Sequence, residues 1–283
     1  MKRDPAFPAE WGILSWNLIA DGMGGRVFVV ERSDGTRAVV KQASAVVIRE
    51  GENVRSADFL AWRSGAGAVE LLGRHDDLAM LEYLSGAMLL DVFEKESDDD
   101  ATIIAADVIR RLHAVGTTPP PATLEPLREH FVSLFRKAEA DRRAGQSSQF
   151  VEAAETAERL LANQAAVKPL HGDIHHENIM RGARGWVAID PKGLLGDPAF
   201  DIANMFYNPV ESPLRTDQRR IAAMAGILAD RLDQDVGKLL DYAFAFSALS
   251  ASWHVEDGNF EEAQRSLAVG HAARAVRRDL SAG

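Results

Sequence analysis

A polar run at residues 171–178 carries the residue types and spacing that phosphoryl transfer requires. Asp173 and Asn178 lie five residues apart in HGDIHHENIM, and Asp190 follows the apolar stretch WVAI. An Asp can accept or orient the proton of an attacking hydroxyl, while an Asn carbonyl and a second carboxylate offer hard oxygen ligands to Mg2+ bridging nucleotide phosphates. The alternative is a polar loop whose Asp and Asn side chains satisfy turn backbones.

Motifs earlier in the chain favour the chemical interpretation. The step from Asp173 to Asn178 is that of the protein-kinase catalytic loop, and Ala38-Val39-Val40-Lys41 resembles the kinase strand whose lysine contacts the α- and β-phosphates. Glu52 stands eleven residues after Lys41, where its carboxylate could hold the ammonium toward the phosphates. Glu50 competes for that role, and a solvated glutamate in the first turn of a helix explains Glu52 equally well.

Two segments are candidates for further nucleotide contacts. In DGMGG, Gly24 and Gly25 lack a Cβ, which would let backbone N–H groups approach phosphate oxygens; an ordinary hairpin turn is the alternative. Glu82, Tyr83 and Leu84 end the last expected strand of the first region. We expect this segment to offer backbone groups to adenine, although a core strand would also explain it.

The elements that must position these residues divide into two unequal regions. Turn residues in RSDG separate two β-branched segments, residues 27–31 and 36–41, which predicts a hairpin. A strand in WGILSWNLIA, a helix over residues 50–63 and two short strands in AVELLGRHDDLAMLEYL complete a small α+β region. We therefore expect a nucleotide-binding lobe over residues 1–84 and a mainly helical lobe, with the catalytic loop and substrate pocket, over residues 85–283.

The second region shows mostly the 3.6-residue period of helices. Ser97 is the expected N-cap of its first helix, Asp197 before Pro198 is another, and we assign Asp201 a structural role. The short segments 179–180 and 186–189 flank a turn and predict a hairpin within the helical region. The other expected helices span about residues 127–144, 150–163, 214–232, 236–253 and 260–279.

Composition excludes several classes of protein. The 283 residues include 32 Lys and Arg against 42 Asp and Glu, a net charge of -10 that disfavours nucleic-acid binding. The absence of cysteine excludes disulfides and thiolate metal sites and fits a reducing compartment. No apolar run approaches the roughly 20 residues of a membrane span, and the first residues lack the apolar core of an export signal. We expect a cytoplasmic protein without membrane partners, as a monomer or weak dimer.

The chain-long combination of motifs resembles the aminoglycoside and hydroxyurea antibiotic-resistance kinases. The similarity rests on AVVK, LEYL, LHGDIHHENIM and IDPKGLLGDPAFDIANMFYNP, in that order, and on LIAD, WRSGAGAVELLGR and ALSASW. It implies an α+β, protein-kinase-like fold of two lobes that uses ATP and Mg2+ to phosphorylate a hydroxyl of a small molecule. The chain has no DFG, no APE and no long activation segment, which disfavours a protein substrate.

The resemblance also implies a role for each matching residue. Asp173 is the expected catalytic base, and Asn178 and Asp190 are the expected magnesium ligands. Lys41 is the expected phosphate-contacting lysine, with Glu52 as its partner. The Glu52 match is the weakest of these, because the helix after it is one residue out of step with the family pattern.

The acceptor implied by the resemblance is a cationic aminoglycoside, with streptomycin expected. Guanidinium groups favour an acidic pocket, because carboxylates bind them through bidentate hydrogen bonds. The candidate substrate contacts are Asp173, His176, Glu177, Trp253, Glu256 and Asp257; for the last three, a helix end with a solvated acidic turn is the alternative. Hydroxyurea or another hydroxylated metabolite remains an alternative acceptor, and a nucleotide-binding pseudokinase is the alternative from a different class.

Overall fold

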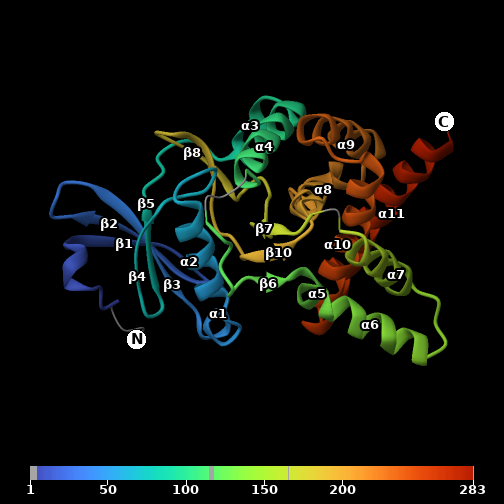
Figure 1. The fold of residues 1–283 in the computed structure, drawn as a ribbon, viewed down its shortest axis with the longest axis horizontal. Helices are drawn as coiled ribbons and strands as arrows, with labels where there is room; N and C mark the ends of the chain where they lie inside the picture. Colours follow the sequence, from blue (N-terminus) through green and yellow to red (C-terminus); the bar gives the residue numbers. More distant parts are fainter. Residues whose placement is uncertain (1–4, 115–117, 165, 283) are drawn as a thin grey trace.

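The computed structural model describes residues 5–114, 118–164 and 166–282 and has an N-terminal sheet region beside a mostly helical region (Figure 1). The first four residues, which bear on the expectation about an export signal, lie outside that description. In Figure 1 the sheet lies at one end of the long axis and the C-terminal helix α11 at the other. The two-lobed, α+β fold expected from the sequence is confirmed.

Five antiparallel strands in the order β1-β2-β3-β5-β4 form the N-terminal sheet. The hairpin expected from RSDG joins β2 to β3, with Val27 opposite Lys41. Phe28, Val30 and Val40 are buried in a small apolar core on one face of this sheet. The strands are β1 Ile13–Gly22, β2 Gly25–Arg32, β3 Arg37–Ala43, β4 Leu71–His75 and β5 Leu78–Glu82.

The helix expected over residues 50–63 begins later than predicted. Ser44 caps a separate short helix, α1 (Ala45–Arg49), by accepting a hydrogen bond from the backbone N–H of Val47. Gly51 then adopts a left-handed conformation with φ 70°, and α2 (Glu52–Arg63) starts after it. The change of direction at Gly51 places Glu52 in the first turn of α2.

The helical region is built around α10, which is apolar on nearly all sides and almost completely buried. The helix expected over 127–144 is interrupted at Phe131, and the short helix α3 was not predicted. The helix expected to open at Pro198 begins as a 3-10 turn and continues as α8. Ser97 and Asp197 act as N-caps, as expected. The helices are α3 Leu89–Lys95, α4 Asp98–Leu112, α5 Leu127–His130, α6 Val132–Arg143, α7 Gln149–Ala162, α8 Ala203–Tyr207, α9 Gln218–Leu232, α10 Val236–Glu256 and α11 Phe260–Ala282, with 3-10 turns at Ala9–Trp11, Pro198–Ile202 and Pro213–Thr216.

Short strands between the two regions carry the loops of chemical interest. The predicted hairpin is present as β8 (Ile179–Gly182) and β9 (Gly185–Ala188). A second small sheet has the order β6-β10-β7, with β6 Glu125–Pro126, β7 Lys168–Leu170 and β10 Leu194–Gly196. The segment 171–178 thus runs from β7 to β8, and Asp190 lies between β9 and β10.

The hairpin also joins the two regions through the backbone. Ala188 of β9 donates a hydrogen bond to the Gly67 carbonyl at 2.9 Å, and its own carbonyl accepts one from Val69 at 2.8 Å. Residues 67–69 lead from α2 into β4 of the N-terminal sheet. Because backbone bonds of this kind have little freedom, they place the end of β9 close to α2 and the sheet.

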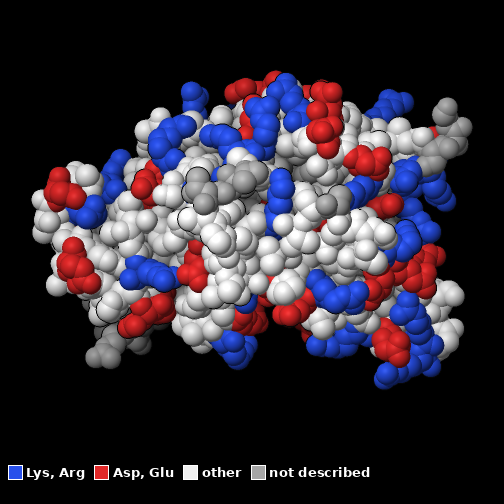
Figure 2. All heavy atoms as spheres, viewed as in Figure 1, with Lys and Arg blue, Asp and Glu red and all other residues white. Residues whose placement is uncertain are grey.

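The molecular surface mixes both signs of charge. Figure 2 shows Lys and Arg interspersed with Asp and Glu, with no patch of a single sign covering this face. None of the helices within the described residues is long and apolar enough to cross a membrane.

Phe131 offers a test of how the helical core is held. Its side chain is fully buried and its ring packs against Phe135 and Phe200. We expect Phe131→Ala to lower the free energy of unfolding by about 3–5 kcal/mol, because it removes apolar burial and leaves a cavity. Val132→Ala is the matched control; its side chain is 50% exposed, and we expect a change of about 0.5 kcal/mol. Urea unfolding measures both, and equal losses would contradict this packing.

Candidate active site

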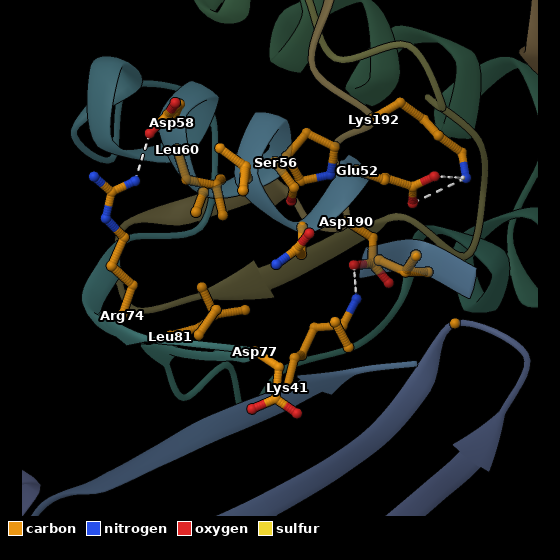
Figure 3. Close-up of a pocket in the computed structure, with 18 of the residues that line it drawn as sticks. Lys41, Glu52, Ser56, Asp58, Leu60, Arg74, Asp77, Leu81, Asp190 and Lys192 are labelled. Atoms are coloured by element: carbon orange, nitrogen blue, oxygen red, sulfur yellow. Dashed lines mark hydrogen bonds and ion pairs between the residues drawn. The ribbon is translucent and has the colours of Figure 1, made fainter. Parts of the chain in front are cut away.

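A cavity of about 640 Å3 lies where β3, α2, the β4–β5 turn and the loops after β7 and β9 meet (Figure 3). Lys41, Asp173, Asn178 and Asp190 all line it. Segments far apart in the sequence therefore bring the four residues expected to act on a nucleotide into one cavity.

Asp173 is oriented by a side chain that the sequence analysis missed. The Nδ2 of Asn204 in α8 donates to Asp173 Oδ1 at 2.7 Å, and Asn208 Nδ2 donates to Asn204 Oδ1 at 2.8 Å. These two hydrogen bonds fix the rotamer of the Asp173 side chain through Oδ1 and do not involve Oδ2. The signal was an Asn within the apolar run IANMFY, where a buried polar residue requires a partner.

Asp201 holds the backbone just before Asp173. Its two carboxylate oxygens accept hydrogen bonds from the N–H groups of His171 and Gly172, at 3.0 and 2.6 Å. His113 Nε2 lies 2.8 Å from the same carboxylate. Asp201 is fully buried, so its role is structural, as expected, and it acts on the catalytic loop directly.

His171 completes the support of this loop in its neutral form. Burial lowers the pKa of His171, against the opposing effects of Asp201 and Asp173. Nε2 donates to the Ile189 carbonyl at 2.8 Å, and Nδ1 accepts the Asp173 N–H at 3.2 Å. One tautomer satisfies both bonds, and it ties the loop after β7 to the end of β9.

Asn178 and Asp190 have side chains that suit the magnesium ion implied by the sequence resemblance. Asn178 Nδ2 donates to the Asp173 carbonyl at 2.9 Å, so its Oδ1 remains available to the cavity. Asp190 contributes a carboxylate from a strained left-handed backbone with φ 64°, a conformation typical of functional positions. No group of three or more His, Asp or Glu in the described part of the chain could hold a metal alone. Two oxygen donors still fit Mg2+, which takes its other ligands from phosphates and water.

Lys41 and Glu52 are not paired as expected. The ammonium of Lys41 contacts the Asp190 carboxylate, while both oxygens of Glu52 lie 3.2 Å from Nζ of Lys192 (Figure 3). The prediction that Glu52 pairs with Lys41 is therefore not met, because Lys192 reaches across from the segment after Asp190 to the start of α2. Burial lowers the pKa of Lys41 to about 8, although Glu52 and Asp173 oppose that effect. The sequence analysis did not single out Lys192, although it lies only two residues after Asp190 in DPKG.

The two glycines expected near the phosphates have different surroundings. Gly24 lines the cavity, and a Cβ there would meet no atom within 4 Å. Gly25 has φ 126°, and a Cβ there would lie 2.0 Å from the Gln42 carbonyl. The backbone of β3 thus explains why position 25 is glycine, and contact with a phosphate remains a prediction for both residues.

The segment expected to bind adenine lies at the end of β5. Glu82 pairs with Arg184 and accepts a hydrogen bond from the Glu70 N–H at 3.0 Å. The guanidinium of Arg37 lies 4.0 Å from the ring centre of Tyr83. Glu82, Tyr83 and Leu84 are not among the residues that line the described cavity. Leu81 is the last residue of β5 that lines it. Their contact with adenine remains a prediction.

Several expected substrate contacts lie away from the cavity. His176 is fully buried and packs edge-on against Phe93, 5.2 Å between ring centres, so its side chain does not reach a substrate here and the expectation is corrected. Glu177 is exposed, 3.9 Å from His175.

The late acidic segment packs against other helices. Trp253 stacks edge-on against His130, and Glu256 accepts hydrogen bonds from Ser133 and Arg136 of α6 at 3.1 and 3.2 Å. Asp257 caps the end of α10. The helix-end alternative accounts for these three residues.

The cavity is acidic overall. Among its described lining residues, three cations each contact one carboxylate: Lys41 with Asp190, Lys192 with Glu52, and Arg74 with Asp58 at 2.5 Å. Asp76, Asp77 and Asp173 also line it and leave an excess of negative charge.

This combination of a five-stranded sheet, a helical region and a cavity between them defines a protein-kinase-like fold. The aminoglycoside phosphotransferase APH(4)-Ia, solved with ADP and hygromycin B, matches with a TM-score of 0.64 at 15% identity, over 95% of this chain and 96% of the other. A choline kinase from Cryptosporidium parvum matches with a TM-score of 0.63 at 11% identity, over 94% and 89%. At such identities the likeness establishes the fold alone.

Sequence comparison identifies the family. The model of the aminoglycoside/hydroxyurea antibiotic resistance kinases matches residues 10–258, and the chain belongs to this family. It is 40% identical to the streptomycin 3''-kinase of Klebsiella pneumoniae over 71% of this chain and 75% of that protein. It is 30% identical to the streptomycin 6-kinase of Streptomyces griseus over 93% and 85%, and 30% identical to a hydroxyurea phosphotransferase of Kitasatospora aureofaciens over 94% and 76%.

The burial of His176 predicts a specific dependence of stability on pH. Burial, with smaller effects of Arg220 and His175, lowers the pKa of His176 from 6.5 to about 3. Below pH 6.5 the unfolded chain binds a proton at this ring that the folded chain does not, so the folded state loses stability as the pH falls. We expect this group to cost wild type about 2 kcal/mol between pH 7 and pH 5, a loss that His176→Phe avoids.

Urea unfolding of wild type and His176→Phe at pH 7, 6 and 5 measures the effect. The difference between the two proteins should shift in favour of the variant as the pH falls. Parallel curves for the two proteins would contradict a buried, neutral His176.

Proposed function

We propose that the protein transfers the γ-phosphoryl group of ATP, bound with Mg2+, to a hydroxyl of streptomycin. The observation that carries the proposal is the single cavity that Lys41, Asp173, Asn178 and Asp190 line together. Residues 1–84 would act as the nucleotide-binding lobe and residues 85–283 would supply the catalytic loop and the acceptor pocket. The proposal includes action in the cytoplasm, where ATP is available, as a monomer or weak dimer.

Asp173 would act as the base in this reaction. The acceptor hydroxyl oxygen forms a bond to the γ-phosphorus, the bond from that phosphorus to the β–γ bridging oxygen breaks, and ADP leaves. The hydroxyl proton passes to the Asp173 carboxylate. Asn204 holds Oδ1 of that carboxylate, so Oδ2 is the oxygen left to face the acceptor.

The remaining cavity residues would position the nucleotide. Lys41 would exchange its contact with Asp190 for the α- and β-phosphates, and Asn178 Oδ1 and the Asp190 carboxylate would hold Mg2+. The ion, when bound, neutralises charge on the phosphates. Catalysis of this type depends mainly on positioning and electrostatic stabilisation, which fits a set of fixed charged side chains.

The acidic lining supports a cationic acceptor. Streptomycin carries guanidinium groups, which pair well with carboxylates such as those of Asp76, Asp77 and Asp173. Relatives named for streptomycin phosphorylate it at different positions, 3'' and 6, so the acceptor is proposed without choosing the hydroxyl. A phosphate added to the drug would change its charge and weaken its fit to its target.

Hydroxyurea is the second candidate acceptor, because the family includes hydroxyurea phosphotransferases. It is small and uncharged, so it would not need the excess of carboxylates in the cavity. Another hydroxylated metabolite would use the same catalytic residues. A pseudokinase would bind nucleotide without turnover, and the presence of Asp173, Asn178 and Asp190 together argues against it.

An ADP-release assay over several acceptors tests the proposed function. We expect turnover with streptomycin in the presence of Mg2+ and ATP, and much less with hydroxyurea, hygromycin B or small alcohols. Phosphorus NMR of the product would then identify the hydroxyl. Turnover with hydroxyurea alone would favour the second candidate, and nucleotide binding without any ADP release would support the pseudokinase.

Asp173→Asn tests the base. The amide keeps the shape of the side chain but cannot take the proton, so we expect turnover to fall by about 10^3-fold or more. The dissociation constant for ATP with Mg2+, measured by calorimetry, should change by less than about threefold. A variant with near-normal turnover would contradict the mechanism.

Asn204→Leu tests the positioning of that base. Removing the donor to Asp173 Oδ1 should lower kcat by about 10- to 100-fold, the cost of a hydrogen bond to a charged group, with little change in the KM for ATP. Asn204→Gln, which keeps an amide, should retain more activity than Asn204→Leu. Equal losses in the two variants, accompanied by equal losses of stability, would indicate a role in folding only.

A further inference from the structure

Lys192 lines the cavity but has no role in the mechanism proposed above. Its Nζ lies 3.2 Å from both carboxylate oxygens of Glu52 (Figure 3). Its backbone is fixed as well, because its N–H donates to the His171 carbonyl at 2.7 Å. The lysine is thus held at both ends, beside the loop that carries Asp173.

The charges around Lys192 keep its ammonium protonated. Burial lowers its pKa, but the carboxylates of Asp173 and Glu52 outweigh this effect and leave the pKa raised overall. Lys41 and Lys192 also repel each other across the cavity, which lowers the pKa of Lys41. Lys41 and Lys192 therefore both border the cavity, each beside one carboxylate, and they provide two ammonium groups that phosphate oxygens could contact.

The loop between Asp173 and Asn178 contains no Lys or Arg. Residues 174–177 are Ile, His, His and Glu. His176 is buried, with its pKa lowered to about 3, and Glu177 carries the opposite charge. Lys41 already contacts Asp190, and Arg74 pairs with Asp58 at the far end of the cavity. Of the two lysines that line the described cavity, Lys192 is the one whose pKa the charge of Asp173 raises more than the charge of any other carboxylate does.

We propose that Lys192 is a second phosphate-binding lysine, which binds the γ-phosphoryl group during transfer while Lys41 binds the α- and β-phosphates. This inference rests on the proposed function. The ammonium leaves Glu52 for the equatorial oxygens of the transferring group, where negative charge must be stabilised. Lys192 keeps its proton throughout, since the hydroxyl proton goes to Asp173 and the electrons of the broken bond go to ADP. Glu52 holds the ammonium close by when no nucleotide is bound.

The rival explanation is a purely structural ion pair that ties α2 to the segment after Asp190. The two explanations differ in which nucleotides lose affinity when the lysine is removed. A lysine that contacts the γ-phosphate affects ATP and its non-hydrolysable analogue AMP-PNP but not ADP, which lacks that phosphate. A structural tie affects stability first, and it depends equally on both partners.

The experiment compares Lys192→Met, Lys41→Met and Glu52→Gln by kinetics and by calorimetry with ADP and AMP-PNP. We expect Lys192→Met to lower kcat by about 100-fold or more and to weaken AMP-PNP about tenfold, with ADP affinity within twofold of wild type. Lys41→Met should weaken both nucleotides. Glu52→Gln leaves the ammonium in place and should lower kcat much less than Lys192→Met.

Two matched controls separate charge from bulk. Lys192→Arg keeps a cation and should recover part of the lost kcat, and Lys95→Met removes an exposed lysine of α3 and should change nothing measured here. Equal losses of kcat and of unfolding stability in Lys192→Met and Glu52→Gln would overturn the proposal, as would a loss of ADP affinity matching that of Lys41→Met. If wild type phosphorylates no acceptor, the proposed function fails, while the AMP-PNP and ADP comparison still decides the γ-phosphate contact.

Discussion

Two lysine–carboxylate contacts cross the cavity in opposite directions, and the arrangement of the site depends on them. Lys41 of β3 reaches Asp190 in the helical region, while Lys192 of that region reaches Glu52 of α2. Like charges gathered in a partly buried cavity repel strongly, because water screens them poorly there. Each lysine lowers that cost and also joins the sheet to the helical region. In the proposed function, the same two ammonium groups would bind the phosphates of the nucleotide.

Behind the cavity, buried polar side chains hold the loop that carries Asp173. The Asp201 carboxylate binds two successive backbone N–H groups, and neutral His171 links the loop to β9. Asn204 then sets the rotamer of Asp173 from a third direction. Such support matters because phosphoryl transfer gains its rate from groups already in place when charge develops. In the proposed function, the loop would stay fixed while the ion pairs of Lys41 and Lys192 exchange to admit ATP.

Local signals in the chain were sufficient for much of the fold. The hairpin of β2 and β3, the caps at Ser97 and Asp197, and the buried helix α10 all follow from turn chemistry, capping and apolar period, which act over a few residues. The break at Gly51 and the interruption at Phe131 were not predicted, because the apolar period continues across both positions while the backbone changes direction. The strands β6, β7 and β10 are too short to show the alternation of apolar and polar residues that predicts a strand.

The residue types and their order already indicate the chemistry: Lys41, Asp173, Asn178 and Asp190, in that order, are typical of a nucleotide-dependent phosphotransferase, since each residue type suits one task. Which side chains meet depends on how the chain packs. Glu52 stands in sequence where it could serve Lys41, yet it pairs with Lys192, 140 residues away along the chain. His176 lies between Asp173 and Asn178 in sequence, but its side chain is buried and does not line the cavity. Pairing and burial depend on distances that only the packed chain sets, because a short motif specifies what a side chain can do and not which side chain it meets.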